Sequence, residues 1–276
     1  MEENKIELED KAIMYKIVVT NDDGIEALGI HKLVKSLDGL AEVVVVAPDT
    51  ERSAEGQRIT VREGLKIKKV DFHGMEHVQA WAVSGTPADC VKMALNVILD
   101  EKPDLVISGI NAGLNLGKDI YYSGTVSAAR EAVIYEIPAI AISYENHFHK
   151  HDFGEVEKLL RPILEDIKIH DIPADVLVNI NIPHIKEEQL RGVVVTGLDL
   201  HHYRDRMDEK PDATGVPEYW LEREYGEIRT IRNNDYHMIR NQYITLTPVH
   251  IDSTDYNFLK QMETWSVIKK NPMNEK

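Results

Sequence analysis

The chain has 276 residues, which is enough for one large hydrophobic core or for one core with an appendage. Its formal net charge of -15 excludes a broad basic surface for a nucleic-acid polymer, although a bound metal ion can still attract a small phosphorylated ligand. The single cysteine, Cys90, excludes an internal disulfide, and no apolar run is long enough to span a membrane. The amino terminus is acidic and polar, unlike a secretory signal, so we expect a cytoplasmic protein.

The amino-terminal residues differ in character from the first apolar run. Residues 1–13 are mostly charged and polar, so we expect an extension without contacts to a sheet or a ligand. Residues 14–276 are expected to form a single domain, because they contain no repeats and no low-complexity linker. Residues 15–20 are rich in β-branched side chains and predict a buried strand.

Two adjacent aspartates, Asp22 and Asp23, follow this strand, and Gly24 after them permits a sharp turn. Neighbouring side chains in a strand point to opposite faces, so the two carboxylates converge only if the strand has ended before them. Placing two carboxylates together is costly unless a cation holds them, and their hard oxygens suit Mg²⁺, Mn²⁺ or Ca²⁺. The alternative is that one of the aspartates only caps the next helix.

Strands and helices alternate along the first half of the chain. Apolar periodicity predicts helices over 25–37, 86–98 and 125–135, and strands over 41–47, 80–83, 105–107 and 137–143. Continuous valine and isoleucine runs between helices predict an α/β fold with a mostly parallel sheet covered on both faces. Ligands of such sheets bind beyond the carboxyl ends of the strands, so the loops that follow three of these strands should meet at one edge.

The second half of the chain is less regular. The pattern predicts a helix over 153–169 and strands over 176–182, 193–195 and 243–248. The polar segment 201–233 contains a predicted hairpin around Tyr225 and Gly226, and a terminal helix and tail follow residue 252. This segment has little apolar surface to fold onto its own core. We therefore expect an oligomerisation arm over about residues 201–276, part of which crosses to a partner subunit.

Two loops at the predicted ligand edge carry polar side chains. Residues 47–56 supply a hydroxyl at Ser53 and a guanidinium at Arg52, although such a loop alone is more typical of a surface, and Arg52 either contacts phosphate or lies in solvent. Residues 108–117 carry a glycine at every fourth position, interleaved with asparagines: Gly109, Asn111, Gly113, Asn115 and Gly117. Backbone amides of such a loop can approach an anion closely, and an asparagine oxygen can bind a metal ion. The alternative is an ordinary turn-rich connection.

A third loop ends in Ser123, Gly124 and Thr125, directly before a predicted helix. Exposed amides at a helix start, together with two hydroxyls, favour a phosphate site. Ordinary capping of the helix by Ser123 or Thr125 is the competing interpretation, and the two are compatible.

Four ordered motifs together resemble the SurE survival protein family, and the resemblance runs from about Tyr15 to Val249. The motifs are Asn21-Asp22-Asp23-Gly24, Ser84-Gly85-Thr86-Pro87-Ala88-Asp89-Cys90, Ser108-Gly109-Ile110-Asn111 and Tyr122-Ser123-Gly124-Thr125-Val126. In the C-terminal half, Asp235, His237 and residues 243–248 resemble the closing motif of that family.

This resemblance implies a Rossmann-like three-layer domain with a C-terminal β-rich appendage that swaps between the subunits of a homodimer or homotetramer. It also implies a metal-dependent phosphatase that hydrolyses nucleoside monophosphates to nucleoside and phosphate, as a 5'-nucleotidase. Activities as a 3'-nucleotidase and polyphosphatase remain open. The resemblance assigns one divalent ion per subunit, Mg²⁺, Mn²⁺ or similar, to Asp22, Asp23, Ser53 and Asn111.

The chemistry of phosphate esters suggests roles for the remaining residues. The substrate phosphate is expected to contact Asn21, Gly109, Asn111, Gly113, Asn115, Ser123, Gly124 and Thr125. Asp22 or Asp23 would orient or deprotonate the attacking water, and His237 is either a general acid for the leaving group or a structural residue.

Two other classes of function are weighed against this one. A non-catalytic regulator that binds nucleotide or metal is the main alternative. A dinucleotide-dependent oxidoreductase is disfavoured, because the first strand leads to Asp-Asp-Gly and not to a Gly-x-Gly-x-x-Gly turn. The alternating His147, His149 and His151 are more typical of an exposed loop than of a transition-metal site.

Overall fold

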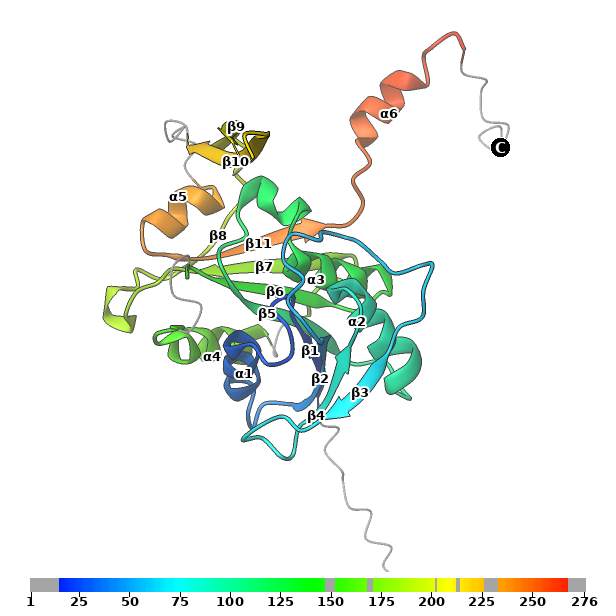
Figure 1. The fold of residues 1–276 in the computed structure, drawn as a ribbon, viewed down its shortest axis with the longest axis vertical. Coiled ribbons are helices and arrows are strands. Elements are labelled where there is room, and N and C mark those ends of the chain that lie inside the picture. Colours follow the sequence, from blue (N-terminus) through cyan, green and yellow to red (C-terminus); the bar gives the residue numbers. More distant parts are fainter. Residues whose placement is uncertain are drawn as a thin grey trace, which may run out of the picture.

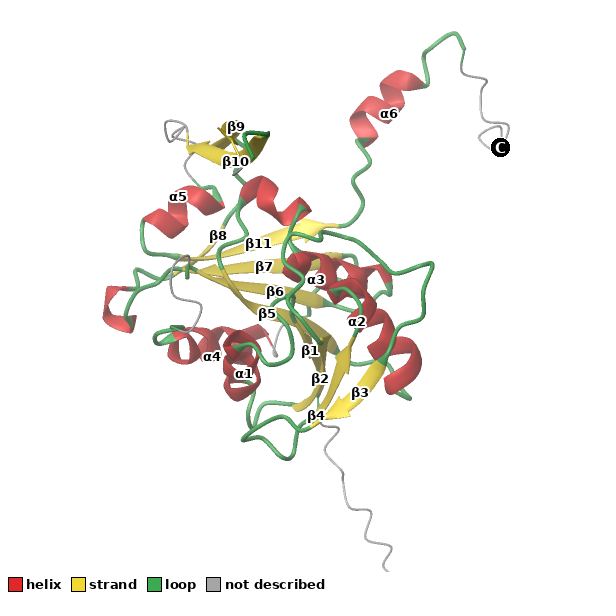
Figure 2. Cartoon of the chain, viewed as in Figure 1, coloured by secondary structure: helices red, strands yellow, loops and turns green. Residues whose placement is uncertain are grey.

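The protein is built on one large mixed sheet with helices on both faces (Figures 1 and 2). The computed structural model describes residues 15–146, 152–167, 171–201, 203–211, 214–225 and 233–267. The nine-stranded sheet has the order β3-β4-β2-β1-β5-β6-β7-β11-β8, and β9 and β10 form a separate hairpin. The strands are β1 (Lys16–Thr20), β2 (Glu42–Pro48), β3 (Ile67–Val70), β4 (Gln79–Val83), β5 (Leu105–Ala112), β6 (Ala139–Tyr144), β7 (Val176–Ile182), β8 (Val193–Val195), β9 (Tyr203–Pro211), β10 (Pro217–Tyr225) and β11 (Ile244–His250).

Strands β4, β2, β1, β5, β6 and β7 run parallel, as the buried valine and isoleucine runs predict. Strand β3 pairs antiparallel with β4, and β11 pairs antiparallel with β7. The helices are α1 (Leu28–Ser36), α2 (Pro87–Met93), α3 (Gly124–Ile134), α4 (Val156–Ile167), α5 (Asp235–Arg240) and α6 (Tyr256–Met262). The predicted α/β class with a mostly parallel sheet is confirmed.

Two apolar clusters make the core, one on each face of the sheet. Helices α1 and α4 pack on one face through residues such as Leu33 and Leu160. Helices α2 and α3 pack on the other face, where Cys90 is fully buried among small residues. Burial raises the pKa of the Cys90 thiol well above its ordinary value, so this cysteine is a packing residue. Thr86 and Asp89 form a capping box at the start of α2.

The hairpin differs from the sequence prediction. Strands β9 and β10 pair from Tyr203 with Tyr225 to Pro211 with Pro217, so the turn lies between the two prolines and not at Tyr225 and Gly226. The intervening segment contains Asp and Gly residues that favour a turn, and a proline at each end limits the ladder. Helix α5 was not predicted either, because its single polar turn has no apolar periodicity.

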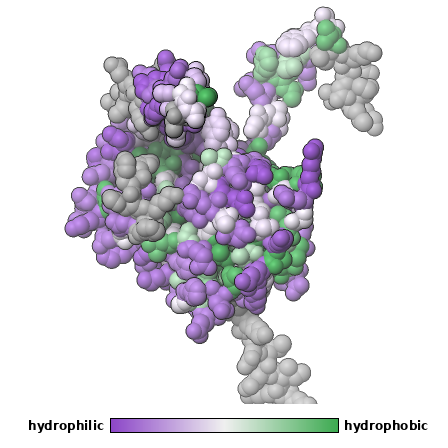
Figure 3. All heavy atoms as spheres, in the orientation of Figure 1, coloured by the Kyte–Doolittle hydropathy of each residue, from purple (hydrophilic) through white to green (hydrophobic). Residues whose placement is uncertain are grey.

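The C-terminal part stands apart from the sheet. Helix α6 projects away from the body of the domain on an extended connection (Figure 1). Figure 3 shows green, hydrophobic atoms on this projecting segment, and Tyr256, Phe258 and Trp265 are exposed. None of the helices in the described part of the chain has the length and apolar character needed to cross a bilayer. Residues 1–13 and the histidines at 147, 149 and 151 lie outside the described residues.

Candidate active site

A tight turn at the carboxyl end of β1 begins the site, and Asn21 closes it. The Asn21 amide nitrogen donates to the Gly24 carbonyl oxygen at 2.7 Å, and the Gly24 amide donates back to the Asn21 side-chain oxygen at 3.2 Å. Gly24 has a φ of +99°, a conformation that favours glycine. The buried Asn21 side chain therefore shapes the turn that presents the two aspartates, whereas the sequence suggested that it contacts phosphate.

Asp22 lies against the amino terminus of α3. Its carboxylate accepts a 2.5 Å hydrogen bond from the Thr125 hydroxyl, and only 4% of the residue is exposed. A Cβ atom added to Gly124 would lie 2.7 Å from the Cβ of Asp22, so this position requires glycine. Ser123 caps the helix by accepting from the Val126 amide at 3.1 Å. The helix start that the sequence assigned to phosphate thus also holds a carboxylate of the chain itself, which suits the positive end of the helix dipole.

Asp23 points to the other side of the turn. It is partly exposed, and its carboxylate accepts from the Ala112 amide at 3.2 Å. Burial and, after it, the negative charge of Asp23 together raise the pKa of Asp22 to about 7, although the Thr125 hydroxyl opposes the shift. Two neighbouring carboxylates with one of them buried form an electrostatically unfavourable pair. A divalent cation between them would relieve this repulsion.

The two carboxylates line a cavity of about 220 Å³, called here the strand-end cavity. Its walls come from the loops after β1, β2 and β5, from the segment before α3, and from β10. The lining residues are Asp22, Asp23, Ser53, Ala54, Asn111, Ala112, Leu114, Asn115, Asp119, Tyr122, Ser123 and Arg223. All four predicted metal ligands are among them, and all four offer hard oxygen atoms. The donor set therefore fits Mg²⁺ or Mn²⁺.

A second cavity of about 610 Å³ runs along α1 and shares Asp23 and Ala112 with the strand-end cavity. Its walls include His31, Met75 and Phe153. The two cavities therefore adjoin at Asp23 and Ala112.

The glycine-rich loop is held in place by its own amides. Ala112 donates to Asp23, Gly113 donates to the Tyr144 carbonyl at 2.9 Å, and Gly117 donates to Asp235 at 2.7 Å. The Asn115 amide donates to the Asn181 side chain at 2.9 Å. These four amides donate within the protein, and the phosphate contacts expected of this loop stay predictions. Their hydrogen bonds fix the loop against β6, β7 and α5.

Close packing, backbone conformation and a hydrogen bond restrict which residues this loop can carry. A Cβ atom on Gly109 would lie 2.5 Å from the Ile142 carbonyl oxygen, so only glycine allows β5 to approach β6 there. Gly113 has a φ of +146°. The Asn111 side-chain nitrogen donates to the Gly113 carbonyl at 2.7 Å, which fixes the amide so that its oxygen is the remaining ligand atom.

A buried network of asparagines supports the loop from below. Asn115 donates to the Ser143 hydroxyl at 2.8 Å, and its carbonyl accepts from Asn179 at 2.9 Å and from Asn181 at 3.1 Å. Sequence reasoning did not predict these partners. The signal was present, because two asparagines interrupt the otherwise apolar run 176–182, and buried amides need hydrogen-bond partners.

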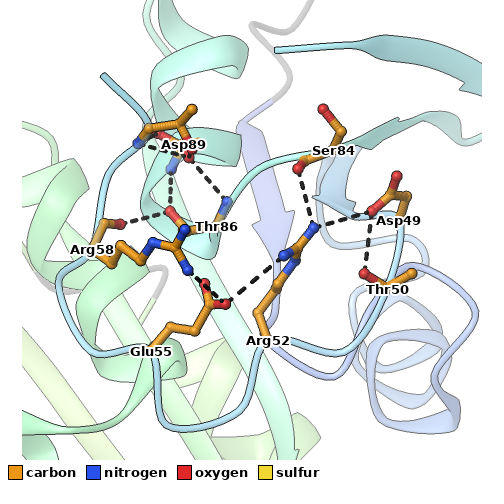
Figure 4. Close-up of polar contacts among 9 residues, drawn as sticks. Asp49, Thr50, Arg52, Glu55, Arg58, Ser84, Thr86 and Asp89 are labelled. Atoms are coloured by element: carbon orange, nitrogen blue, oxygen red, sulfur yellow. Dashed lines mark hydrogen bonds and ion pairs between the residues drawn. The ribbon is translucent and has the colours of Figure 1, made fainter. Parts of the chain in front are cut away.

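Polar contacts hold the Ser53 loop against the segment between β4 and α2 (Figure 4). Arg52 donates to the Ser84 carbonyl at 3.1 Å and lies 3.7 Å from Asp49 and 3.8 Å from Glu55. The Arg52 amide donates to the Asp22 carbonyl at 2.7 Å. Arg52 therefore fixes this loop beside Asp22 and is not among the residues that line the strand-end cavity. Ser53 itself is exposed and donates to Glu51 at 2.8 Å.

Comparison with known proteins identifies the family. The family model described as survival protein SurE matches residues 17–205. This chain belongs to the SurE family. The 5'-nucleotidase SurE of Brevibacillus brevis is 45% identical over 263 residues, which cover 92% of this chain and 97% of that protein. The 5'-nucleotidase SurE of Heliobacterium modesticaldum is 41% identical and covers 91% of each chain. The crystal structure of the SurE protein from Aquifex aeolicus superposes with a TM-score of 0.79 at 39% identity, covering 90% of this chain and 98% of that one.

The residues that resemble the closing motif of the SurE family lie on α5 and β11. Asp235 is fully buried and accepts from the amides of Gly117 and Asp199, so it ties α5 to the glycine-rich loop. His237 is partly buried, its ring contacts the Asn241 side chain at 3.4 Å, and it is not among the lining residues of the strand-end cavity. Among the described residues, no group of three or more His, Cys, Asp or Glu side chains is arranged to hold a metal ion.

Proposed function

We propose that this chain is a divalent-metal-dependent nucleotidase that hydrolyses nucleoside monophosphates to nucleoside and phosphate. The observation that carries the proposal is the pair Asp22 and Asp23 at the carboxyl end of β1, in a cavity with Ser53 and Asn111. Relatives that match about nine-tenths of this chain at 37–45% identity bear the name 5'-nucleotidase SurE. A phosphoric monoester hydrolase on this sheet edge is favoured over a regulator without turnover.

Asp22, Asp23, Ser53 and Asn111 would hold one divalent ion per subunit. When bound, such an ion neutralises charge on a phosphoryl oxygen and lowers the pKa of a bound water. The choice between Mg²⁺ and Mn²⁺ stays open, because both prefer hard oxygen ligands.

The side chains of this chain would divide the remaining work. Ser123 lines the strand-end cavity and offers its hydroxyl as a donor to the phosphate, and Asn111 and Asn115 line the same cavity. Asp23 is the partly exposed carboxylate, so it is the better placed of the two to orient the attacking water and accept its proton. Asp22 is held by Thr125 and packs on Gly124, which disfavours it as a nucleophile.

Two roles stay predictions from the sequence. The first role is contact with the phosphate. It is supported only by the positions of the residues: Asn21 in the turn after β1, Gly109 and Gly113 in the glycine-rich loop, and Gly124 and Thr125 at the start of α3. A general-acid role of His237 is supported only by the family resemblance. Location in the cytoplasm is likewise a prediction.

We further propose that the protein is a homodimer or homotetramer. The hairpin exposes Tyr219, Trp220 and Leu221, and α6 exposes Tyr256 and Phe258. Large apolar side chains clustered on projecting elements are typical of surfaces that another subunit covers.

A phosphate-release assay tests the proposed activity. The full-length protein is incubated with a panel of nucleoside 5'- and 3'-monophosphates and with polyphosphate, in Mg²⁺, in Mn²⁺ and in EDTA. We expect metal-dependent release of phosphate from nucleoside monophosphates. Stoichiometric nucleotide binding without release in saturating metal would identify the regulator instead.

A further inference from the structure

The strand-end cavity is lined mainly by acidic side chains, but one basic side chain also lines it. Among its lining residues, Asp22, Asp23 and Asp119 are acids, and Arg223 is the basic one. Arg223 lies on β10, far along the chain from the loops that carry the aspartates. The hairpin therefore contributes a side chain to the cavity of the strand edge.

Arg223 is held at the cavity wall by a defined set of contacts. Its guanidinium donates to Asp119, with nitrogen–oxygen distances of 3.1 and 3.4 Å, and lies 4.6 Å from the centre of the Tyr203 ring. Lys118 lies 3.8 Å from the same ring, and the Tyr203 hydroxyl donates to Asp119. Tyr203 is buried, so the base of the hairpin is fixed beside Asp119.

Resting on the proposed function, we propose that Arg223 binds the phosphate of the substrate and is a determinant of affinity for phosphomonoester dianions. The guanidinium presents five N–H donors in a planar fork that matches phosphate, and Asp119 engages only part of them. The Arg223 side chain is 44% exposed, and Arg223 is one of the residues that line the cavity. Asp119 then acts as a placeholder, because its carboxylate holds the guanidinium at the wall until a dianion competes for it.

The same hairpin contains a matched pair without this setting. Arg206 on β9 binds Asp208 with distances of 2.8 and 3.0 Å, which is the same two-point geometry. Arg206 is exposed, and neither member of this pair lines the strand-end cavity. Exposed ion pairs contribute little to stability. Arg206→Met therefore controls for the loss of an exposed arginine ion pair on the same hairpin.

The test compares Arg223→Met, Arg223→Lys and Arg206→Met in the full-length protein with Mn²⁺. The measurements are KM and kcat for a nucleoside monophosphate and the inhibition constant of inorganic phosphate. For Arg223→Met we expect KM and the phosphate inhibition constant to rise about tenfold or more, with a smaller change in kcat. Arg223→Lys should recover part of the loss, and Arg206→Met should match the wild type. KM and phosphate inhibition within twofold of wild type in Arg223→Met would overturn the proposal.

Two further measurements test the competition between Asp119 and phosphate, and the binding of phosphate without turnover. Asp119→Asn removes the competing charge, so phosphate should bind more tightly, and adding Arg223→Met should abolish that gain. A gain that persists in the double variant would contradict the role of Arg223. If the wild type releases no phosphate, the proposed function fails, and calorimetric titration of inorganic phosphate into the Mn²⁺-loaded wild type and Arg223→Met still tests Arg223 alone.

Discussion

The two aspartates at the end of β1 and the C-terminal elements differ in the kind of group that they bury and expose. Asp22 is a charged group that is almost completely buried, with a hydroxyl, a helix terminus and a glycine arranged around it. The hairpin and α6 are the reverse case, since Trp220, Tyr256 and Phe258 are large apolar side chains left at the surface. Charge is buried where a cation is needed, and apolar surface is exposed where another subunit would cover it.

The two regions also differ in how firmly contacts within one chain hold them in place. The strand-end cavity has most of its walls from residues 22–123, and hydrogen bonds fix each of its loops. The hairpin and α6 make few contacts with the sheet, yet the hairpin sends Arg223 into the cavity. Changes at the strand edge should therefore affect chemistry, and changes at α6 should affect assembly.

The largest effect is expected at Asp23. Asp23→Asn should lower the rate of phosphate release about 100-fold or more, because it removes a charged ligand and the partly exposed carboxylate beside the attacking water. The melting temperature should stay close to wild type, since Asp23 packs in no apolar cluster. Asp38→Asn, at a side chain that is 70% exposed and remote from the cavity, is the matched control. Equal loss in both variants would contradict a specific role of Asp23.

A methyl group at Gly124 tests the packing around Asp22. Gly124→Ala places a Cβ 2.7 Å from the Cβ of Asp22, so the aspartate must move, and we expect a loss of activity of about tenfold or more. Gly64→Ala has open space around its added Cβ and serves as the control. Steady-state kinetics of both variants decide the matter. Wild-type kinetics in Gly124→Ala would mean that the position of Asp22 does not limit turnover.

The buried charge of Asp22 should reduce stability when metal is removed. The pKa of Asp22 in the folded protein is raised from 3.8 to about 7, so the unfolded chain binds fewer protons and stability falls as the pH rises between these values. Asp22→Asn should therefore stabilise the metal-free protein at pH 8 by on the order of 2 kcal/mol, and the gain should vanish near pH 4. Urea unfolding in EDTA at both pH values measures it. Destabilisation by Asp22→Asn at pH 8 would refute the account of this pair.

The smallest effect is expected on assembly. Replacing Tyr256 and Phe258 by serine should weaken subunit association by about tenfold or more without changing activity per assembled subunit. Val97→Ser, at an equally exposed apolar side chain on the body of the domain, should leave association unchanged. Light scattering across micromolar concentrations reports the mass. A monomeric wild-type protein over this range would show that these surfaces serve another purpose.

Much of the sheet edge could be predicted from the sequence, because local signals and the global fold agree there. The parallel sheet followed from valine and isoleucine runs. The four proposed oxygen ligands come from the loops after three of its strands: Asp22 and Asp23 after β1, Ser53 after β2 and Asn111 at the end of β5. The phosphate contacts of the glycine-rich loop stay a prediction, while four of its amides donate within the protein. Periodic glycines show that a backbone approaches something closely, but not whether that partner is an anion or Asn181.

Long-range contacts explain what the sequence could not provide. Asp119 and Arg223 are 104 residues apart, and no local pattern pairs them. The turn of the hairpin was predicted at the wrong place, because two segments have residues typical of a turn. One is Tyr225 and Gly226, and the other, where the turn lies, is the segment between Pro211 and Pro217. Asn179 was missed because the run 176–182 was taken for a purely apolar strand.

The central claim is that Asp22 and Asp23 together bind the catalytic cation. A crystal soaked in Mn²⁺ and measured for anomalous scattering tests it most directly. We expect one strong peak per subunit with oxygen atoms of both aspartates roughly 2.0–2.4 Å away. A protein that binds Mn²⁺ at another place while Asp22 and Asp23 have no peak beside them would contradict the account.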